Sequence, residues 1–471
     1  MPNALAIKPW FRPVFELPRD ADFVRLRTWL LCWLVLPNLP FLPITLMGGP
    51  PRMREILICG IVALFARSMN YWFRLAVFTG ILGYMVINFI SHMFNMHISM
   101  ILSVIGLVAD IQPAVSPEYV AGIGLLLAMV VLAVWLLRKK DSNFTQPRQA
   151  ILALIAIIAL AGADVAISRG AMGSYSRMAP EDTPFTSASH QADLLGLADG
   201  KTNLMVVVVE AMGQPTDPRL AAQLDHIWMR PELADRYAMS RGDTAFFGST
   251  TSGEMRELCQ RWGNYDEIKA FDTSCVPAIL AQKGYRTTAF HSFTKKFFDR
   301  QTWYPLIGFQ EMVFGEELKA RGVSFCPNVF PGACDREVPA LIGKQLAQGG
   351  KPQFIYWLTL NSHLPIVENR ELGTENCQRL GHGLDEDYPM ICRLFSIWSN
   401  TADALVKVVE RPDFPPTDIL IVGDHMPPFT HQKSRLQFDS EHVPWILLRH
   451  RERASEPAVA QAHSGAPRAA L

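Results

Sequence analysis

Residues 203–210 read Asn-Leu-Met-Val-Val-Val-Val-Glu, a continuous apolar run that ends in a carboxylate. Such a run, without alternating polar residues, is typical of a strand buried on both faces of a parallel sheet. Phe354–Leu360 and Ile419–Val422 have the same character, and helix-like stretches such as Val276–Lys283 and Val338–Leu346 lie between the runs. This alternation predicts an α/β domain with a mostly parallel sheet and helices on both faces.

Polar side chains follow each of these predicted strands. Glu210 ends the first run, Asn361, Ser362 and His363 follow the second, and Asp424 and His425 follow the third. Ligands of open α/β sheets bind beyond the carboxyl ends of the strands. Carboxylates combined with imidazole suit zinc or manganese, whereas an all-oxygen set would suit magnesium. Each residue alone could be an ordinary strand end or turn, but their joint occurrence favours a metal site.

A hydroxyl-rich segment adds a further candidate. Residues 248–254 read Gly-Ser-Thr-Thr-Ser-Gly-Glu and precede the helix-like stretch Met255–Leu258. The ordinary explanation is a helix N-cap, with Glu254 three residues after Thr251 completing a capping box. The same position also suits a nucleophile that attacks phosphate, because the helix N-terminus holds an anion and a metal lowers the hydroxyl pKa.

The first 168 residues have a different composition, dominated by long apolar runs. About 20 apolar residues cross a bilayer, and we predict a bundle of five transmembrane helices, roughly at 27–47, 54–67, 72–94, 119–137 and 149–168. Arg138, Lys139, Lys140 and Arg148 mark the loop before the last span as cytoplasmic, so five spans export everything after Ser168. The whole chain has 44 basic and 44 acidic residues, which gives no electrostatic signature of nucleic-acid binding.

The expected organisation has four parts. These are a transmembrane domain at 1–168, a linker rich in Gly, Ser, Ala and Pro at 169–200, an extracytoplasmic catalytic domain at 201–450, and a disordered tail at 451–471.

Six cysteines lie in the exported part, and their spacings suggest the local pairs Cys259 with Cys275, Cys326 with Cys334, and Cys377 with Cys392. Sequence alone leaves about 15 connectivities open. A zinc site is the alternative, but the chain has no Cys-x-x-Cys pair, so disulfides are favoured.

Five motifs, in this order, resemble the sulfatase-like branch of the alkaline phosphatase superfamily, more narrowly its membrane-bound lipoteichoic acid synthases and phosphoethanolamine transferases. They are residues 203–210, Thr251-Ser252, residues 284–300, Thr359-Leu-Asn-Ser-His-Leu-Pro365 and Gly423-Asp-His-Met-Pro427. The motifs cover most of residues 200–450, and five preceding spans also match that group.

The resemblance implies roles for individual residues. Its metal ligands would be Glu210, Thr251, Asp424 and His425, with zinc or manganese as the cofactor. Thr251 would be the nucleophile, with the adjacent Thr250 as the alternative. His363 and Arg300 would be catalytic and would contact the substrate phosphate or the leaving group. Phe297 and Asn361 would also bind the substrate, and His431 and His291 are further candidates for the site.

The function implied is metal-dependent transfer of a phosphoglycerol or phosphoethanolamine headgroup through a phospho-threonine intermediate. The donor would be a membrane phospholipid, the acceptor an envelope glycan or lipid, and the location a bacterial inner membrane with the catalytic domain in the periplasm. Residues 295–300 resemble phosphoglycerol enzymes, whereas the six cysteines resemble phosphoethanolamine transferases, so the headgroup stays open. Sulfatases carry Cys- or Ser-x-Pro-x-Arg, and Cys275-Val-Pro-Ala-Ile lacks its arginine, which disfavours sulfate hydrolysis.

Two other functions remain open at this point. A hydrolase could use the same site with water as the acceptor. A membrane-tethered binding or assembly protein with a degenerate site would be no enzyme at all.

Overall fold

The computed structural model describes residues 21–46, 49–93, 98, 101, 110–139, 141–168, 179–380 and 384–451. The chain divides into two compact units, Met1–Phe89 with Ala121–Gly170 and Ile90–Val120 with Ala171–Leu471. The limits predicted for the domains, linker and tail stay predictions, and residues 169–178 and 452–471 lie outside the described part.

Four helices are long and apolar enough to cross a membrane. The first is the composite helix Ala21–Leu46, which starts with α1 (Ala21–Trp29), contains a π-helical turn at Leu30–Val35 and ends with α3 (Leu42–Leu46). The others are α5 (Tyr71–Met93), α7 (Pro117–Lys139) and α8 (Pro147–Ser168), with mean hydropathies of 1.7, 2.8 and 2.6 over their most apolar windows. These four agree with four of the five predicted spans.

The second predicted span, 54–67, corresponds to the helix α4 (Met53–Ala66), which has only 14 residues. At 1.5 Å per residue it is about 21 Å long, shorter than the roughly 30 Å hydrocarbon layer. Among the described residues four of the five predicted spans are therefore long enough to cross a membrane, and the predicted second span is a helix of 14 residues. α4 packs against α8, where Gly60 faces Ile157 so closely that a Cβ would lie 2.7 Å from its side chain.

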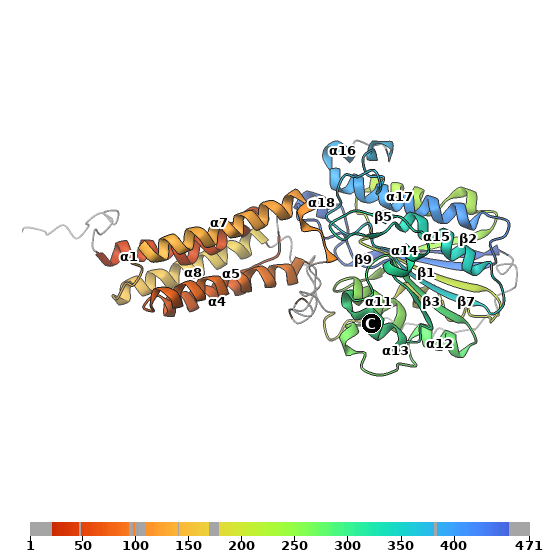
Figure 1. The fold of residues 1–471 in the computed structure, drawn as a ribbon, viewed down its shortest axis with the longest axis horizontal. Helices are drawn as coiled ribbons and strands as arrows, with labels where there is room; N and C mark the ends of the chain where they lie inside the picture. The colour runs from red at the N-terminus through yellow and green to blue at the C-terminus, as the bar shows by residue number, and fades with distance from the viewer. Residues whose placement is uncertain are drawn as a thin grey trace, which may run out of the picture. The chain divides into compact units, whose positions relative to one another are not determined.

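The second unit (Ile90–Val120 with Ala171–Leu471) includes the predicted catalytic domain and is called the catalytic unit below. It contains a seven-stranded sheet in the order β2-β9-β8-β1-β7-β3-β4 (Figure 1). β8 (Thr417–Gly423), β1 (Asn203–Val209), β7 (Gln353–Leu358), β3 (Arg286–His291) and β4 (Glu311–Val313) are parallel. β9 (His442–His450) is antiparallel to both β8 and β2 (Tyr237–Ala245), so the sheet is mixed and mostly parallel, as predicted.

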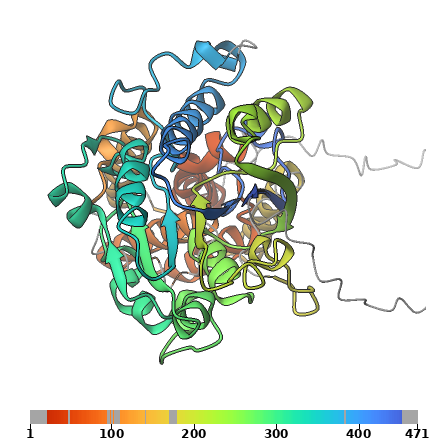
Figure 2. The same ribbon diagram turned by 90° about the vertical axis from the view of Figure 1, so that its right-hand side faces the viewer.

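Helices cover both faces of this sheet (Figures 1 and 2). On one face, Met205, Val207 and Val209 of β1 belong to a core that includes residues of α10 (Pro218–Trp228), α15 (Val338–Leu346) and α17 (Pro389–Val409). On the other face lie α11 (Thr250–Cys259), α12 (Val276–Gln282) and α13 (Arg300–Leu306). All seven residues of β1 are buried, which explains its unbroken apolar run.

Smaller elements complete the unit. They are α9 (Ala188–Gln191), α14 (Gly315–Ala320), α16 (Leu384–Asp387), α18 (Gln432–Arg435) and the hairpin of β5 (Phe325–Cys326) with β6 (Gly332–Ala333). The six cysteines form disulfides in the three suggested pairs, 259–275, 326–334 and 377–392. Among the described residues Cys32 and Cys59 are free and buried.

Candidate functional site

The carboxyl end of β1 delivers Glu210 to the edge of the sheet. The backbone is strained immediately afterwards, because Ala211 has a φ of 57° in the left-handed region that non-glycine residues rarely occupy. Its N–H donates to Asp424 Oδ1 at 2.8 Å. The unusual turn thus ties the end of β1 to the residue that follows β8.

The end of β8 approaches β1 closely because residue 423 is glycine. A Cβ at Gly423 would lie 1.8 Å from the carbonyl oxygen of Met212, so only glycine fits there. The buried Arg256 of α11 donates to the carbonyl oxygens of Gly423 at 2.6 Å and Asp424 at 3.2 Å. These contacts fix the direction in which the Asp424 side chain leaves the strand.

The first turn of α11 places Thr250, and not Thr251, beside these residues. Thr250 Oγ1 donates to Glu210 Oε2 at 3.1 Å and lies 3.3 Å from His425 Nε2. The fully buried Thr251 instead has Ser249 Oγ at 3.4 Å. The capping box is absent: the N-cap is Ser249 without a side-chain cap, and Glu254 is bound elsewhere.

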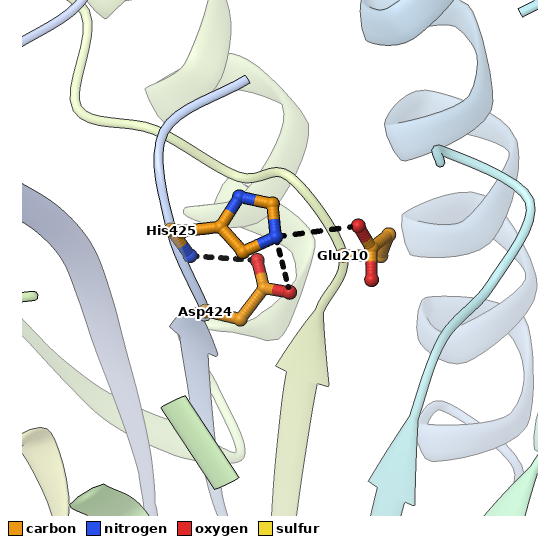
Figure 3. A group of neighbouring side chains, drawn as sticks. All are labelled: Glu210, Asp424 and His425. Carbon is orange, nitrogen blue, oxygen red and sulfur yellow. Dashed lines mark hydrogen bonds and ion pairs between the residues drawn. The ribbon is translucent and has the colours of Figure 1, made fainter. Parts of the chain in front are cut away.

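Glu210, Thr250, Asp424 and His425 together form the candidate metal site, three of whose side chains are drawn in Figure 3. His425 Nε2 lies 3.5 Å from Glu210 Oε1 and 3.3 Å from Asp424 Oδ2. Ligand atoms of these three residues all lie within 4.8 Å of one another. Three sheet-edge residues and one helix N-terminal hydroxyl thus converge on a single point.

The chemistry of these atoms fits a divalent cation. Asp424 Oδ2 is buried and makes no hydrogen bond among the described residues, although Oδ1 accepts from two backbone N–H groups. The Nδ1 atom of His425 lies 2.8 Å from the Met426 carbonyl oxygen, which assigns the proton to Nδ1 and leaves a lone pair on Nε2. Burial and the neighbouring Asp424 raise the pKa of Glu210 well above its ordinary value. Two buried carboxylates and an imidazole lone pair repel one another unless a cation lies between them.

Arg300 is held by a buried ion pair rather than left open to the solvent. Its Nη2 donates to Glu254 Oε2 at 2.7 Å and its Nε to the same oxygen at 3.1 Å. Tyr304 and Tyr356 also donate to Glu254. Burial opposes the charge of Arg300, but Glu254 raises its pKa above the ordinary value, so the guanidinium stays positive. It is close enough to Glu210 to favour the charged form of that carboxylate.

His363 lies on the loop after β7, with its ring against Phe330 at a centroid distance of 3.8 Å. Its Nδ1 lies 2.9 Å from the Leu364 carbonyl oxygen. Burial, with a contribution from nearby His425, lowers the pKa of His363 to about 3. His363 is therefore a neutral imidazole at neutral pH.

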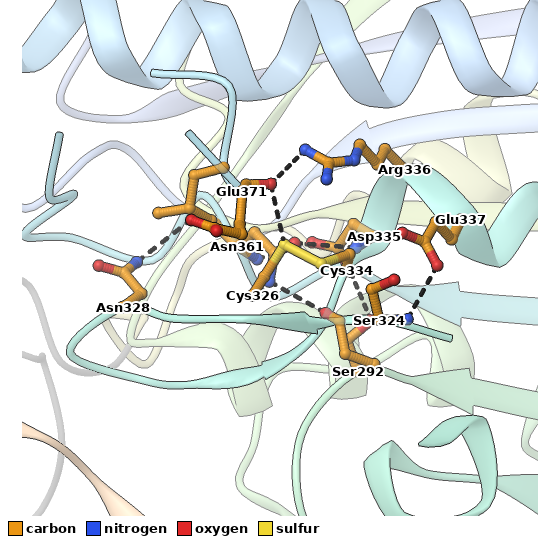
Figure 4. Close-up of a disulfide and its surroundings, with 12 residues drawn as sticks. Ser292, Ser324, Cys326, Asn328, Cys334, Asp335, Arg336, Glu337, Asn361 and Glu371 are labelled. Carbon is orange, nitrogen blue, oxygen red and sulfur yellow. Dashed lines mark hydrogen bonds between the residues drawn. A yellow bond between two sulfur atoms is a disulfide. The ribbon is translucent and has the colours of Figure 1, made fainter. Parts of the chain in front are cut away.

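The loop that carries His363 is fixed by Asp335 (Figure 4). Asp335 Oδ2 accepts from the backbone N–H groups of Leu360 at 2.8 Å and Asn361 at 2.6 Å, and Ser292 donates to Oδ1. Burial raises the pKa of Asp335 to about 6. The adjacent disulfide between Cys326 and Cys334 closes the loop that contains Phe330, so both supports of His363 meet here.

The other predicted residues occupy different places. Asn361 uses its side chain within the loop, where Oδ1 accepts from the Asp335 N–H at 2.8 Å and Nδ2 donates to the Ala333 carbonyl at 3.1 Å. His291 is buried, with Nδ1 3.1 Å from the Leu358 carbonyl oxygen, and burial lowers its pKa well below the ordinary value. Phe297 packs with Phe293, Phe298 and Phe330. His431 is exposed at the start of α18.

Sequence reasoning missed three residues that organise the site. Arg256, Glu254 in its role as the partner of Arg300, and Asp335 act through contacts made in the folded chain. Arg256 offered a signal, since an arginine on the apolar side of a short helix needs buried acceptors. The pairing of Glu254 with Arg300, 46 residues apart, leaves no local pattern.

The protein-family model described as Sulfatase matches residues 237–463. This stretch includes Thr250, Asp424 and His425, which the geometry brings together. The domain belongs to the sulfatase/alkaline phosphatase superfamily. Among curated proteins no sequence matches the chain significantly.

Solved structures resemble this chain at low identity. The lipooligosaccharide phosphoethanolamine transferase A of Neisseria meningitidis is 12% identical, with a TM-score of 0.44 over 92% of this chain and 89% of that chain. The lipoteichoic acid synthase LtaP of Listeria monocytogenes is 13% identical, with a TM-score of 0.41 over 58% of this chain and 69% of that chain. The phosphoglycerol transferase GacH of Streptococcus pyogenes, in complex with sn-glycerol-1-phosphate, is 15% identical, with a TM-score of 0.39 over 57% and 78%.

Proposed function

We propose that this protein transfers the phosphorylated headgroup of a membrane phospholipid to a hydroxyl of an envelope glycan or lipid, with Thr250 as the nucleophile. The observation that carries the proposal is the position of Thr250 Oγ1, 3.1 Å from Glu210 Oε2 and 3.3 Å from His425 Nε2. A hydroxyl in contact with a metal-binding group, at the start of a helix, suits attack on a phosphodiester.

The first step exchanges one phosphate ester for another. A bond forms between Thr250 Oγ1 and phosphorus while the bond between phosphorus and the diacylglycerol oxygen breaks. The proton lost by the threonine balances the proton gained by the departing diacylglycerol. The product is a phosphothreonine that carries the headgroup.

The second step reverses this exchange with a new alcohol. The acceptor hydroxyl attacks phosphorus, the bond to Thr250 Oγ1 breaks, and the threonine regains a proton. We place His363 in this step because its neutral ring, on the loop after β7, can orient the incoming hydroxyl. We assign it as a group that positions the acceptor and not as the general base, because its low pKa makes the ring a weak base.

Glu210, Asp424, His425 and Thr250 would hold a divalent cation, for which we propose zinc or manganese. When bound, such a cation lowers the pKa of the threonine hydroxyl and offsets the negative charge of the phosphate. Arg300 adds a fixed positive charge near the site, and Glu254 keeps its guanidinium in place. Arg300 thus stabilises the negative charge of the phosphate from a fixed position nearby, because most of its N–H groups already make hydrogen bonds within the protein.

Anchoring in the membrane suits the proposed reaction, because the donor is a membrane lipid. Four helices long and apolar enough to span a bilayer hold the chain where its phospholipid donor lies. A transferase in solution would have to extract each lipid from the membrane, which costs the burial free energy of two acyl chains.

The test is product analysis with the full-length protein in vesicles. Phosphatidylglycerol and phosphatidylethanolamine, each labelled in the headgroup, are supplied separately, and diacylglycerol release and labelled protein are measured. We expect diacylglycerol from one of the two lipids and, after acid quench, a labelled peptide that contains Thr250. Labelled free headgroup phosphate without any labelled protein would favour hydrolysis by water. No diacylglycerol from either lipid would overturn the proposal.

A further inference from the structure

A second concave site lies at the carboxyl end of β3, beside the aromatic residues that contact His363. It is a pocket of about 270 Å³ within the catalytic unit. Its walls come from the loop after β3, from α14, from the β5–β6 hairpin and from residues 110 and 112. Side chains that line it include Gln112, Thr294, Glu316, Lys319, Ser324 and Phe325.

Two glycines that line the pocket approach the Ser292 carbonyl oxygen closely. A Cβ at Gly332 would lie 2.3 Å from the Ser292 carbonyl oxygen, and a Cβ at Gly315 would lie 2.9 Å from the same atom. Residue 112 is joined to the opposite wall, because its N–H donates to the Val329 carbonyl oxygen at 2.8 Å. The pocket is therefore tightly packed at these two glycines, and part of its lining comes from the segment that precedes α7.

Most of the lining surface is apolar, but the lining also includes side chains of both charges and one exposed aromatic ring. Phe325 is 53% exposed, although most large apolar side chains of the catalytic unit are buried. Glu316 accepts from Thr294 Oγ1 at 2.9 Å, and both residues line the pocket together with Lys319. Hydroxyl, amide, carboxylate and ammonium groups thus line the pocket together with the Phe325 ring.

This combination selects against two kinds of ligand. An acyl chain would strip water from Glu316 and Lys319 without replacing their hydrogen bonds. A phosphate or carboxylate group would meet the negative charges of Glu316 and Asp110 as well as the single lysine. A neutral polyhydroxylated ring suits both the polar side chains and the aromatic ring of the pocket. Its hydroxyls donate hydrogen bonds to the polar groups and accept them, and its C–H face packs on the aromatic ring.

The pocket is connected to the reaction centre through two sets of contacts. Phe293 lines the pocket and packs against Phe330 at a centroid distance of 6.2 Å, and Phe330 lies against His363. Ser292 also lines it and donates to Asp335, which fixes the loop that carries His363. Because β3, β7, β1 and β8 are neighbouring parallel strands, the pocket and the candidate metal site lie at the same edge of the sheet.

We infer that this pocket binds a sugar ring of the acceptor, which identifies the acceptor as a glycan; this inference rests on the proposed function. Its volume, just below the roughly 300–1,000 Å³ of most ligand pockets, suits a single sugar ring. One ring of the glycan binds between Phe325 and Glu316, and a hydroxyl of another part of the chain reaches the phosphothreonine. That hydroxyl forms the new bond to phosphorus, the bond to Thr250 Oγ1 breaks, and the hydroxyl proton leaves as the threonine regains one.

The experiment separates the two half-reactions in the full-length protein. Headgroup-labelled phospholipid vesicles are incubated with and without the glycan fraction of an envelope that lacks this protein. Diacylglycerol release without glycan reports the donor step, and label recovered in the glycan reports the acceptor step. We expect Phe325→Ala and Glu316→Gln to raise the KM for the glycan fraction about tenfold and to leave diacylglycerol release unchanged.

Phe271→Ala is the matched control, because Phe271 is equally exposed, at 58%, and does not line the pocket. It should leave both readouts unchanged. Unchanged label in the glycan for both pocket variants would overturn the inference, as would label that appears in a lipid and not in a glycan. An equal loss of diacylglycerol release in the pocket variants would also overturn it. Wild-type protein that releases no diacylglycerol would overturn the proposed function itself, a result distinct from all of these.

Discussion

Thr250 Oγ1 donates a hydrogen bond to Glu210 Oε2 across 3.1 Å, although the two residues are 40 positions apart in the chain. The neighbouring Thr251 faces Ser249 instead. The two threonines therefore provide a matched pair for testing which hydroxyl is the nucleophile.

Thr250→Ala should abolish diacylglycerol release, a loss of at least about 1,000-fold, because no other hydroxyl takes its place at the candidate metal site. Thr251→Ala should cost about 1 kcal/mol of unfolding free energy and leave most of the activity. Initial rates and thermal melts of the two variants check this. The opposite ranking of the two rates would assign the chemistry to Thr251.

Removal of the bound metal should lower both activity and stability. A cation present at 100 times its dissociation constant adds about 2.7 kcal/mol to the free energy of unfolding, and chelation removes this contribution. Glu210→Gln and Asp424→Asn should each reduce the bound metal measured by mass spectrometry. Asp413→Asn, which changes an exposed carboxylate paired with Arg411, should keep full occupancy. Equal metal content in all three variants would contradict the site.

The ion pair of Arg300 and Glu254 should show strong coupling. Arg300→Met leaves Glu254 buried without its partner and should cost about 3–5 kcal/mol, as should Glu254→Gln for the reverse reason. The double variant should lose less than the sum of the two single losses, because neither charge is then left alone. Denaturant unfolding of all four proteins measures this coupling, and simple additivity would argue against it.

The disulfide between Cys326 and Cys334 should matter for catalysis beyond its effect on stability. Replacing both cysteines by serine should cost about 2.5 kcal/mol by the chain-entropy relation, and should also lower kcat, because Phe330 and Asp335 then lose their fixed positions beside His363. The control is the same change at Cys377 and Cys392, which should cost about 3 kcal/mol and leave kcat unchanged. Equal kcat in both variants would show that the first disulfide is only structural.

Asp335 predicts a specific dependence of stability on pH. Burial raises its pKa from 3.8 to about 6, so the folded protein binds its proton more tightly than the unfolded chain does. The stability that the protonated form contributes is complete below pH 3.8 and is lost as the pH rises through about 6, a loss of about 3 kcal/mol. Asp335→Asn should show a smaller loss over the same interval. Parallel curves for the two proteins, from urea unfolding at pH 4 to 7, would contradict this.

The central strands were predictable because burial on both faces leaves a strong local pattern. β1, β7 and β8 appear in the sequence as unbroken apolar runs, and their polar ends correctly located the edge of the sheet. β2 escaped prediction because it is an edge strand whose residues alternate irregularly between buried and exposed positions. Because β2 was not predicted, the sequence also offered no reason to place β9 antiparallel to its neighbours.

The details of the site depend on geometry that residue spacing does not determine. Adjacent residues on a helix point about 100° apart, so the choice between Thr250 and Thr251 depends on where α11 begins. Glu254 fits a capping box by its spacing, but Arg300 offers it a full charge in a buried setting, which is the stronger interaction. Asn361 was expected to face the substrate, and its amide instead completes the hydrogen bonds of the Asp335 loop.

The pairing of β1 with β8 has a consequence for biosynthesis. Ala211 and Asp424, which this pairing joins, are 213 residues apart, so a ribosome completes the first long before the second. At about 5–20 residues per second the nascent domain spends on the order of 10–40 seconds with Glu210 made and Asp424 still missing. During that interval the candidate metal site is incomplete. Activity therefore begins only when the last central strand has been delivered and has inserted beside the first.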